Sequence, residues 1–331
     1  NDGSNGLNRS IQENDSSDPD HTIDRSGWTY FPSDTTRACA WNKMLEYSFG
    51  LALAAEAKST GVDGWYAPTC NMQRNPFAGR NSEYISEDAL LSGKSVSEVV
   101  KGCIANGVYP YVKHFAVNDS EAGRQGKYTW LTEQSLREIY LKPFEIATKQ
   151  ARQKLNYWNT ETKSLDYKVI RGCNAVMTAF NCIGPVMCSQ NWYLNTGVLR
   201  NEWGFKGAVL TDYSDHHKYM NGDQALAAGG TLWMDGFMND GSFAFKNEEN
   251  KAAYDQALRQ SAKDVIYMYL NARVRNQAYA EEMDDWSLLK PEIKAPFPLW
   301  AAGLAAVDLL AIGNFVFAVN IWKKRKRELL K

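Results

Sequence analysis

The stretch Leu199–Tyr213, LRNEWGFKGAVLTDY, places one carboxylate at the end of a short apolar run. Ala208–Leu210 predicts a short buried strand, and Asp212 follows at its carboxyl end. Parallel α/β barrels place their chemistry at this end of their strands, so Asp212 is a candidate for nucleophilic or acid–base chemistry. An ordinary helix-capping or salt-bridged Asp is the alternative, and this stretch alone does not decide between them.

Predicted strands and helices alternate along the chain, and they would position such a residue. Helices are expected at Trp41–Ser59, Asp88–Asn106, Thr132–Gln150 (with Thr132 as N-cap), Trp192–Asn201, Gly222–Ala228 and Ala252–Asn276. Strands are expected at Gly64–Pro68, Val108–Phe115, Ala175–Phe180, Ala208–Leu210 and Leu232–Met234, with a loop at 8–27 and a polar insertion at Lys154–Lys168. This alternation predicts a parallel α/β fold, and the polar motifs all follow strands.

Composition narrows the function classes. The 331-residue chain has 44% hydrophobic residues, enough for one large barrel domain or two ordinary domains. The net charge of −1 divides into +5 on residues 323–331 and −6 on residues 1–322, and this mildly acidic body argues against a nucleic-acid-binding face. Six scattered cysteines form no C-x-x-C pair and indicate neither a zinc site nor a disulfide framework. Cys182 and Cys188 are close enough to pair in an oxidising compartment, but buried free thiols are favoured.

The C-terminal region has a different character. Leu299–Trp322 contains 24 mostly apolar residues, roughly 36 Å as a helix, with Trp300 and Trp322 near its ends and KKRKR directly after it. Aromatic ends and a basic flank predict a membrane anchor with a cytoplasmic tail and an external body, hence a cell-membrane location. Asp308 near the centre weakens this prediction, and a helix docked on the body is the alternative.

Six ordered segments resemble glycoside hydrolase family 3, which includes many β-glucosidases and related exo-acting enzymes. They are NDGSNGL (Asn1–Leu7), NPFAGRNSEYISED (Asn75–Asp88), KHFAVND (Lys113–Asp119), LREIYLKPFE (Leu136–Glu145), VMTAFN (Val176–Asn181) and TDY (Thr211–Tyr213). The resemblance covers about residues 1–275. It implies a (β/α)8 TIM-like barrel whose first strand is missing from this chain.

The resemblance also implies residue roles. Asp212 would be the nucleophile that forms a covalent glycosyl-enzyme, and Tyr213 would be a stacking wall for the next sugar. The hydroxyls of the innermost sugar would bind Asp2, Arg80, Lys113 and His114. The two cations Arg80 and Lys113 would also lower the pKa of Asp212. Each residue has a structural alternative: Arg80 could pair with Glu83, His114 could be a satisfied core histidine, and Asp2 could be a turn residue.

The resemblance is incomplete in three respects. No α/β domain that could supply the family's proton donor follows the body, so the acid is expected in an upstream domain of the same polypeptide. Phe180 and Thr231 stand where the family often has Tyr and Asp. The KHFAVND loop also disfavours the acetylglucosaminidase branch, whose loop resembles KHFPGHG.

We therefore predict four segments: an N-terminally truncated barrel domain at 1–276, a linker at 277–297, a transmembrane helix at 298–322 and a basic cytoplasmic tail at 323–331. The chain is predicted to belong to a retaining exo-glycosidase. A β-glucosidase that acts on oligosaccharides or glycosides is the favoured assignment. The alternatives are a non-catalytic glycan-binding surface protein on a degenerate barrel, or a fragment that is inactive without its acid/base domain. Neither a cofactor nor a metal is expected, because no phosphate-binding loop precedes a helix and adjacent His216 and His217 cannot easily face one ion.

Overall fold

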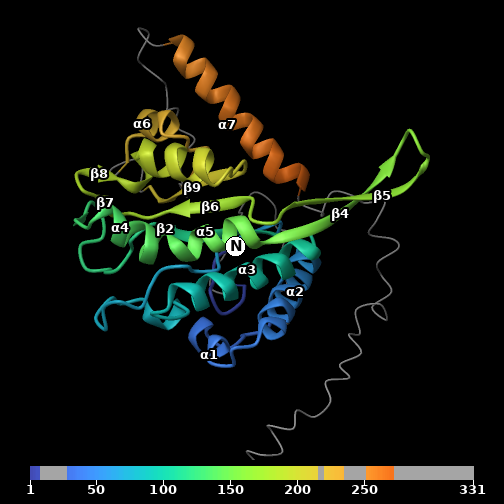
Figure 1. The fold of residues 1–331 in the computed structure, drawn as a ribbon, viewed down its shortest axis with the longest axis horizontal. Coiled ribbons are helices and arrows are strands. Elements are labelled where there is room, and N and C mark those ends of the chain that lie inside the picture. Colours follow the sequence, from blue (N-terminus) through green and yellow to red (C-terminus); the bar gives the residue numbers. More distant parts are fainter. Residues whose placement is uncertain (8–27, 215–219, 235–250, 272–331) are drawn as a thin grey trace, which may run out of the picture. The chain divides into compact units, whose positions relative to one another are not determined.

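A computed structural model describes residues 1–7, 28–214, 220–234 and 251–271, all within one compact unit that spans Asn1–Asn276. Its centre is a parallel sheet of five strands in the order β1-β2-β6-β9-β10. The strands are β1 (Gly64–Trp65), β2 (Tyr109–Phe115), β6 (Ala175–Thr178), β9 (Ala208–Tyr213) and β10 (Leu232–Met234) (Figure 1). Every neighbouring pair is parallel, which confirms the predicted α/β class.

The predicted eight-stranded barrel is only partly confirmed. The described residues form a curled parallel sheet, a half-barrel, in which β1 and β10 are the two edges. Closure into a barrel requires hydrogen bonds that join the edge strands, and the described pairings contain none between β1 and β10. The strand order nevertheless follows the chain order, as in a barrel that is built strand by strand.

Two long helices, α2 (Lys43–Ser59) and α3 (Ala89–Ala105), cross at small residues. A Cβ on Gly102 would lie 2.2 Å from the Tyr47 carbonyl oxygen, so the two backbones approach closely only because a glycine is there. Asn42 and Asp88 cap these helices by accepting hydrogen bonds from first-turn N–H groups. Both predicted helices are confirmed, to within two residues at each end.

The predicted helix at Thr132–Gln150 consists of three pieces, α4 (Glu133–Ser135), the π-helical η2 (Leu136–Tyr140) and α5 (Lys142–Gln150). Thr132 is confirmed as the N-cap, since its hydroxyl accepts from the Ser135 N–H at 3.1 Å. Phe144 from α5 packs edge-on against Phe115 of β2 with ring centroids 5.2 Å apart. This contact packs α5 against the sheet and belongs to the main apolar core.

The polar insertion predicted at Lys154–Lys168 is an antiparallel hairpin of β4 (Arg152–Asn159) and β5 (Ser164–Arg171), which extends away from the sheet (Figure 1). Trp158 pairs with Leu165 across the ribbon, and both are exposed together with Tyr167 and Val169. The absence of a buried face explains why hydrophobic patterning did not predict these strands.

The remaining short elements complete the unit. They are α1 (Asp34–Ala38), η1 (Asn81–Glu83), η3 (Cys188–Gln190), and a small sheet of β3 (Tyr128–Thr129), β7 (Cys182–Ile183) and β8 (Val186–Met187). Cys182 and Cys188 are buried free thiols, as expected.

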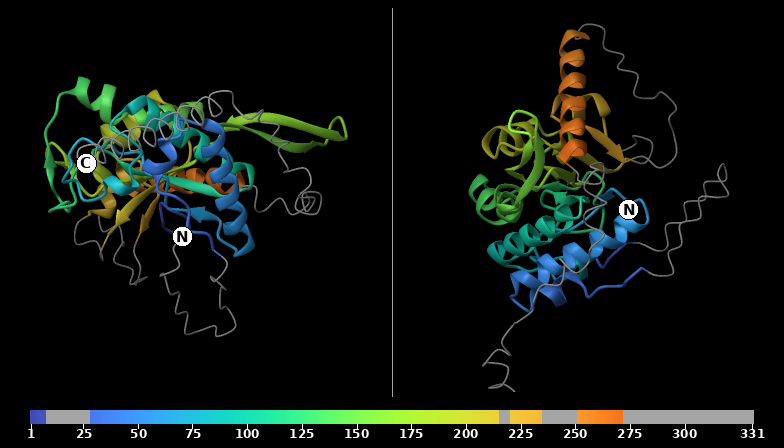
Figure 2. Two further views of the ribbon diagram at one scale, coloured as in Figure 1. Left: turned by 90° about the horizontal axis from the view of Figure 1, so that it is seen from below. Right: turned by 90° about the vertical axis from the view of Figure 1, so that its right-hand side faces the viewer.

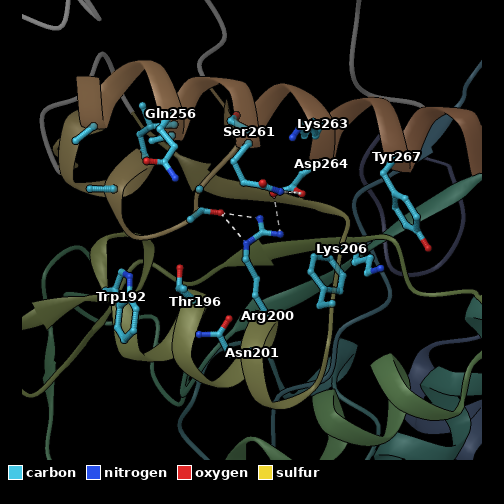
Figure 3. A pocket seen from close by; sticks show the side chains of 18 residues that line it. Trp192, Thr196, Arg200, Asn201, Lys206, Gln256, Ser261, Lys263, Asp264 and Tyr267 are labelled. Carbon is cyan, nitrogen blue, oxygen red and sulfur yellow. Dashed lines mark hydrogen bonds and ion pairs between the residues drawn. The ribbon is translucent and has the colours of Figure 1, made fainter. Parts of the chain in front are cut away.

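The π-helical η4 (Tyr193–Glu202), α6 (Gly222–Ala227) and α7 (Lys251–Asn271) lie near the β9–β10 edge. The Arg200 guanidinium of η4 donates to the Gly229 carbonyl and pairs with Asp264 of α7 at 2.9 Å (Figure 3). Both residues of this pair line a cavity of about 820 Å³ between η4 and α7. None of the predicted site residues lines it.

The predicted linker, membrane helix and tail at 277–331 lie outside the described residues and stay predictions. Within the residues that are described, no helix combines the length and the apolar character needed to cross a bilayer. The orthogonal views in Figure 2 show α2 and α3 side by side and the β4–β5 hairpin extending from one side of the sheet.

Candidate active site

The strand order brings the predicted residues to one end of the sheet. Lys113 and His114 lie at the carboxyl end of β2, and Asp212 lies at the carboxyl end of β9. Asp2 is held at the same end of the sheet by a parallel β-bridge to Tyr66, the residue that directly follows β1. Arg80 precedes η1 in the loop that follows β1. Carboxyl ends of parallel strands share one edge of the sheet, and this topology is why residues more than a hundred positions apart meet here.

Asp212 is 6% exposed and lies between two nitrogen-bearing side chains. Its Oδ1 accepts the Tyr213 backbone N–H at 2.8 Å. Its Oδ2 lies 3.8 Å from His114 Nε2 and 3.9 Å from Arg124 Nη1, with no hydrogen-bond partner among the described residues. Burial raises the pKa of Asp212 above its usual value, and the charge of Arg124 is the strongest effect that opposes the shift.

His114 is buried and fully hydrogen-bonded. Its backbone N–H donates to Asn71 Oδ1 at 2.7 Å, and its carbonyl accepts from Asn71 Nδ2 at 2.8 Å. Arg80 Nη1 lies 2.9 Å from His114 Nε2 and can only donate, which assigns the proton to Nδ1. Burial, followed by the charges of Arg80, Lys113 and Arg124, holds the pKa of His114 well below its usual value, so the ring is neutral.

Arg80 is positioned by carboxylates on two sides. It hydrogen-bonds Glu83 and lies 3.8 Å from Glu121 Oε1. The structural alternative for Arg80, a pair with Glu83, is therefore confirmed, and the same guanidinium also contacts the predicted site residue His114. The two interpretations coexist because the five donors of a guanidinium can bind several partners at once.

Lys113 and Asp2 form a second charged pair. The Lys113 ammonium is almost fully buried and donates to Asp2 Oδ1 at 2.6 Å. Burial acts against the charge of Asp2, yet the adjacent Lys113 holds the pKa of Asp2 below its usual value. Asp2 is thus more than the turn residue of the structural alternative, because it is the counter-charge of a buried ammonium.

A cavity of about 350 Å³ lies beside this pair, within the usual range for small-molecule sites. Asp2, Arg80, Lys113, Glu83, Ser4 and Tyr30 are among its lining residues, whereas Asp212, His114 and Tyr213 are not. These side chains offer carboxylate acceptors, cationic donors and hydroxyl groups on one concave surface. Such a surface suits a small polyhydroxylated molecule, whose hydroxyls both donate and accept.

The sequence did not identify three residues of this cluster. Asn71 orients His114, Glu121 bridges Arg80 and Arg124, and Arg124 approaches Asp212. Each lies in a loop without periodicity, so hydrophobic patterning could not single it out. Arg124 also stacks on Phe180, with its guanidinium carbon 4.5 Å from the ring centroid.

The remaining predictions concern Tyr213, Thr231 and the absence of a metal site. Tyr213 is half-buried next to Asp212, and its predicted stacking role stays a prediction. Thr231 braces β9, since its hydroxyl accepts the Val209 N–H at 2.8 Å. The described residues contain no group of three or more His, Cys, Asp or Glu side chains arranged to hold a metal ion; His216 and His217 lie outside them.

Comparison with known proteins agrees with the resemblance to glycoside hydrolase family 3. Residues 15–156 match the model of the Glycosyl hydrolase family 3 N terminal domain. Beta-glucosidase A of Butyrivibrio fibrisolvens is 36% identical over 57% of this chain and 21% of its own length. A beta-glucosidase of Rhizobium radiobacter is 32% identical over 80% of this chain and 30% of its own length. The structure of beta-glucosidase 3B from Thermotoga neapolitana in complex with glucose superposes with a TM-score of 0.63 and 32% identity, covering 84% of this chain and 36% of that one. The chain thus spans a fifth to about a third of the length of these relatives.

Proposed function

We propose that this chain, in which residues 15–156 match the model of the Glycosyl hydrolase family 3 N terminal domain, is the nucleophile-bearing part of a retaining, exo-acting β-glucosidase. The observation that carries this proposal is the position of Asp212. It is a buried carboxylate at the carboxyl end of β9, and one of its oxygens has no hydrogen-bond partner among the described residues. A nucleophile needs such an uncommitted oxygen, held in place through its other oxygen.

The proposed reaction is a double displacement. Asp212 attacks the anomeric carbon of a terminal β-linked glucose and forms a glycosyl ester as the bond to the leaving oxygen breaks. A separate carboxylic acid protonates that leaving oxygen, and the same group, now a carboxylate, takes a proton from the water that cleaves the ester. We assign this acid to another domain of the same polypeptide, since this chain covers only about a third of the solved relatives.

Binding of the sugar is assigned to the charged cluster beside the 350 Å³ cavity. Asp2 and Lys113 would form hydrogen bonds with neighbouring hydroxyls, since one accepts and the other donates. Arg80 would contribute donors from the other side, and neutral His114 would hold Arg80 through its Nε2. Tyr213 would stack against the next sugar.

Covalent labelling tests the proposal directly. The protein is incubated with a 2-deoxy-2-fluoro-β-glucoside that bears a good leaving group, and the intact mass is measured. This leaving group needs little acid assistance, so the experiment depends mainly on Asp212. The expected result is one glycosyl adduct that maps to Asp212 and is absent from Asp212→Asn.

Two outcomes would overturn the proposal. An adduct on another residue would remove Asp212 as nucleophile. Binding of glucose without any adduct or turnover, in a full-length protein whose fold is intact, would favour a non-catalytic glycan-binding protein.

Membrane attachment through 298–322 is a separate proposal, supported by the apolar run with Trp ends and the basic flank at 323–331. Fractionation of expressing cells tests it. The protein should sediment with membranes and resist alkaline extraction, whereas a version that ends at residue 297 should be released. Release of both versions would contradict the anchor and favour a helix docked on the body.

A further inference from the structure

The β4–β5 hairpin, which extends away from the sheet (Figure 1), carries its exposed apolar side chains on one face. Its antiparallel register places Trp158 opposite Leu165, and Tyr167 and Val169 follow Leu165 at alternate positions of β5. Side chains of directly paired residues, and of every second residue along a strand, point to the same side of a ribbon. All four side chains are more than half exposed. The hairpin thus has one accessible apolar face.

The other face of the hairpin is mainly polar. Tyr157, the neighbour of Trp158, points to this side, and its hydroxyl donates to Asp166 Oδ2 at 3.3 Å. Ser164 is exposed on the same side, and the turn at 160–163, TETK, is polar as well. A two-stranded ribbon is marginally stable by itself, and an accessible apolar surface of this kind indicates a partner.

The hairpin is also basic. Residues 152–171 contain five Lys or Arg and two acidic residues, a net charge of +3, although residues 1–322 as a whole carry −6. The Lys154 ammonium lies 4.4 Å from the centroid of the Tyr167 ring, on the apolar face. This face therefore combines aromatic, aliphatic and cationic groups, a composition that favours the interface of a membrane with anionic lipids.

Two other partners fit this face less well. Two copies of the hairpin would each bring a net charge of +3, so packing them face to face would bring like charges together. A neutral glycan would need open aromatic rings for stacking, but Lys154 lies over the Tyr167 ring. Leu165 and Val169 have no ring, and a neutral glycan offers no counter-charge to five cations.

The base of the hairpin lies near the end of α7 (Figure 1). Burial and the charge of Arg152 lower the pKa of Arg171, the last residue of β5, and Tyr267 of α7 is close enough to oppose that shift. From the end of α7 at Asn271, 26 residues lead to the apolar run at 298–322. Fully extended, they would span at most about 90 Å. Attachment through 298–322 would therefore hold the hairpin within reach of the same membrane.

We propose that the apolar and basic face of the β4–β5 hairpin docks on an anionic lipid surface and lies flat in its head-group region. The inference goes beyond the proposed glycosidase reaction and adds a second contact to the proposed attachment through 298–322. Eight residue pairs give the ribbon a length of about 26 Å. The outer edges of a two-stranded ribbon carry backbone N–H and C=O groups that cannot enter hydrocarbon unsatisfied. The polar tip at 160–163 likewise disfavours entry tip first.

A pair of labelled variants tests which face of the hairpin meets lipid. Leu165→Cys reports from the apolar face, and Ser164→Cys, its neighbour on the polar face, is the matched control. Both are made in Cys39→Ser, because Cys39 is exposed and the other five cysteines are buried. The full chain, labelled with bimane, is reconstituted into phosphatidylcholine vesicles with or without about 30% phosphatidylglycerol. Nitroxide-bearing lipids then quench a label that lies in the bilayer.

In anionic vesicles we expect several-fold stronger quenching of the apolar-face label than of the polar-face label, and little quenching of either without the anionic lipid. Raising salt from about 0.1 M to about 1 M shortens the Debye length from about 10 Å to about 3 Å and should reduce the quenching. Trp158→Ala should reduce it too, whereas Tyr157→Ala, on the polar face, should not. Lys154→Gln and Lys168→Gln should each lower the partition of the hairpin into the head-group region about fivefold.

The alternatives give different results. Equal quenching of the two labels, or an unquenched apolar-face label in vesicles that hold the protein, would overturn the inference. An apolar-face label that is shielded without vesicles would also overturn it, in favour of a second copy if shielding grows with protein concentration and of another domain if it does not. Shielding by insoluble β-glucan but not by lipid would overturn it in favour of a glycan. A quenched apolar-face label on protein that alkaline extraction releases would support the inference and refute the anchor at 298–322.

Discussion

Removal of Arg37 should destabilise the protein strongly, because this residue is the ion-pair partner of two buried carboxylates. The Arg37 side chain pairs with Asp34, lies 3.1 Å from Glu46 Oε2, donates to the Pro32 carbonyl and sits 3.5 Å above the Phe49 ring centroid. Burial raises the pKa of Asp34 and of Glu46, and Arg37 is the main opposing effect for both. Arg37→Met keeps the apolar stem and leaves both carboxylates without their counter-charge.

The size of the effect follows from that geometry. Breaking a buried ion pair by removing one partner costs about 3–5 kcal/mol, out of a total stability of about 5–15 kcal/mol. At about 2–4 °C per kcal/mol for a domain of this size, the melting temperature should fall by roughly 6–20 °C. Exposed Arg137, with its two surface ion pairs, gives the control: Arg137→Met should cost no more than about 1 kcal/mol.

Thermal unfolding followed by circular dichroism at pH 7 and pH 5 measures both variants. Burial already raises the folded-state pKa values of Asp34 and Glu46, and loss of Arg37 raises them further above the unfolded values of about 3.9 and 4.3. The destabilisation is therefore largest at neutral pH and shrinks as pH falls toward those values. Asp34→Asn and Glu46→Gln, added to Arg37→Met, should recover part of the loss. An Arg37→Met loss equal to that of Arg137→Met, or one that does not change between the two pH values, would refute this reasoning.

Two further predictions concern packing and binding. Gly102→Ala should cost about 1–3 kcal/mol in urea unfolding, because its Cβ would lie 2.2 Å from the Tyr47 oxygen and force α2 from α3. Gly197→Ala in η4, whose nearest contact would be 3.8 Å, should be neutral or stabilising, and equal losses in the two variants would contradict the packing argument. Lys113→Met should raise KM, and the Kd for glucose, on the order of 10- to 100-fold, as expected for lost hydrogen bonds to a charged group. Calorimetric titration with glucose checks this, and an unchanged Kd would exclude Lys113 from the sugar site.

Elements with a buried face could be predicted from the sequence because local rules fix them. The apolar runs at Val108–Phe115 and Ala208–Leu210 became β2 and β9, and Thr132 caps the helix that follows it. In each case the residues that form the element also bury its apolar side, so pattern and packing agree. The β4–β5 hairpin was missed for the opposite reason, because its polar and apolar residues alternate along a ribbon with both faces accessible.

The site could be predicted only where a motif marked it. Asp212 was predicted because it follows a predicted strand, whereas Lys113 and His114 were implied by the family resemblance of the KHFAVND segment. The topology then brings these strand ends together. Arg124 and Asn71 were missed, since they reach the site from irregular loops after β2 and β1. Their positions depend on contacts such as the Phe180 platform, which no local pattern contains.

The contacts of Arg80 and Asp2 show that a structural role and a functional role can belong to the same residue. Arg80 pairs with Glu83 and also holds His114. Asp2 forms a β-bridge with Tyr66 and is also the counter-charge of Lys113. A buried charged group must be satisfied to be stable, so a site with several of them has to bind its own members together. Satisfied pairs are therefore what a preorganised polar site requires. The informative exceptions are atoms left without a hydrogen-bond partner, and among the described residues of this cluster they include Asp212 Oδ2 and Arg124 Nη1.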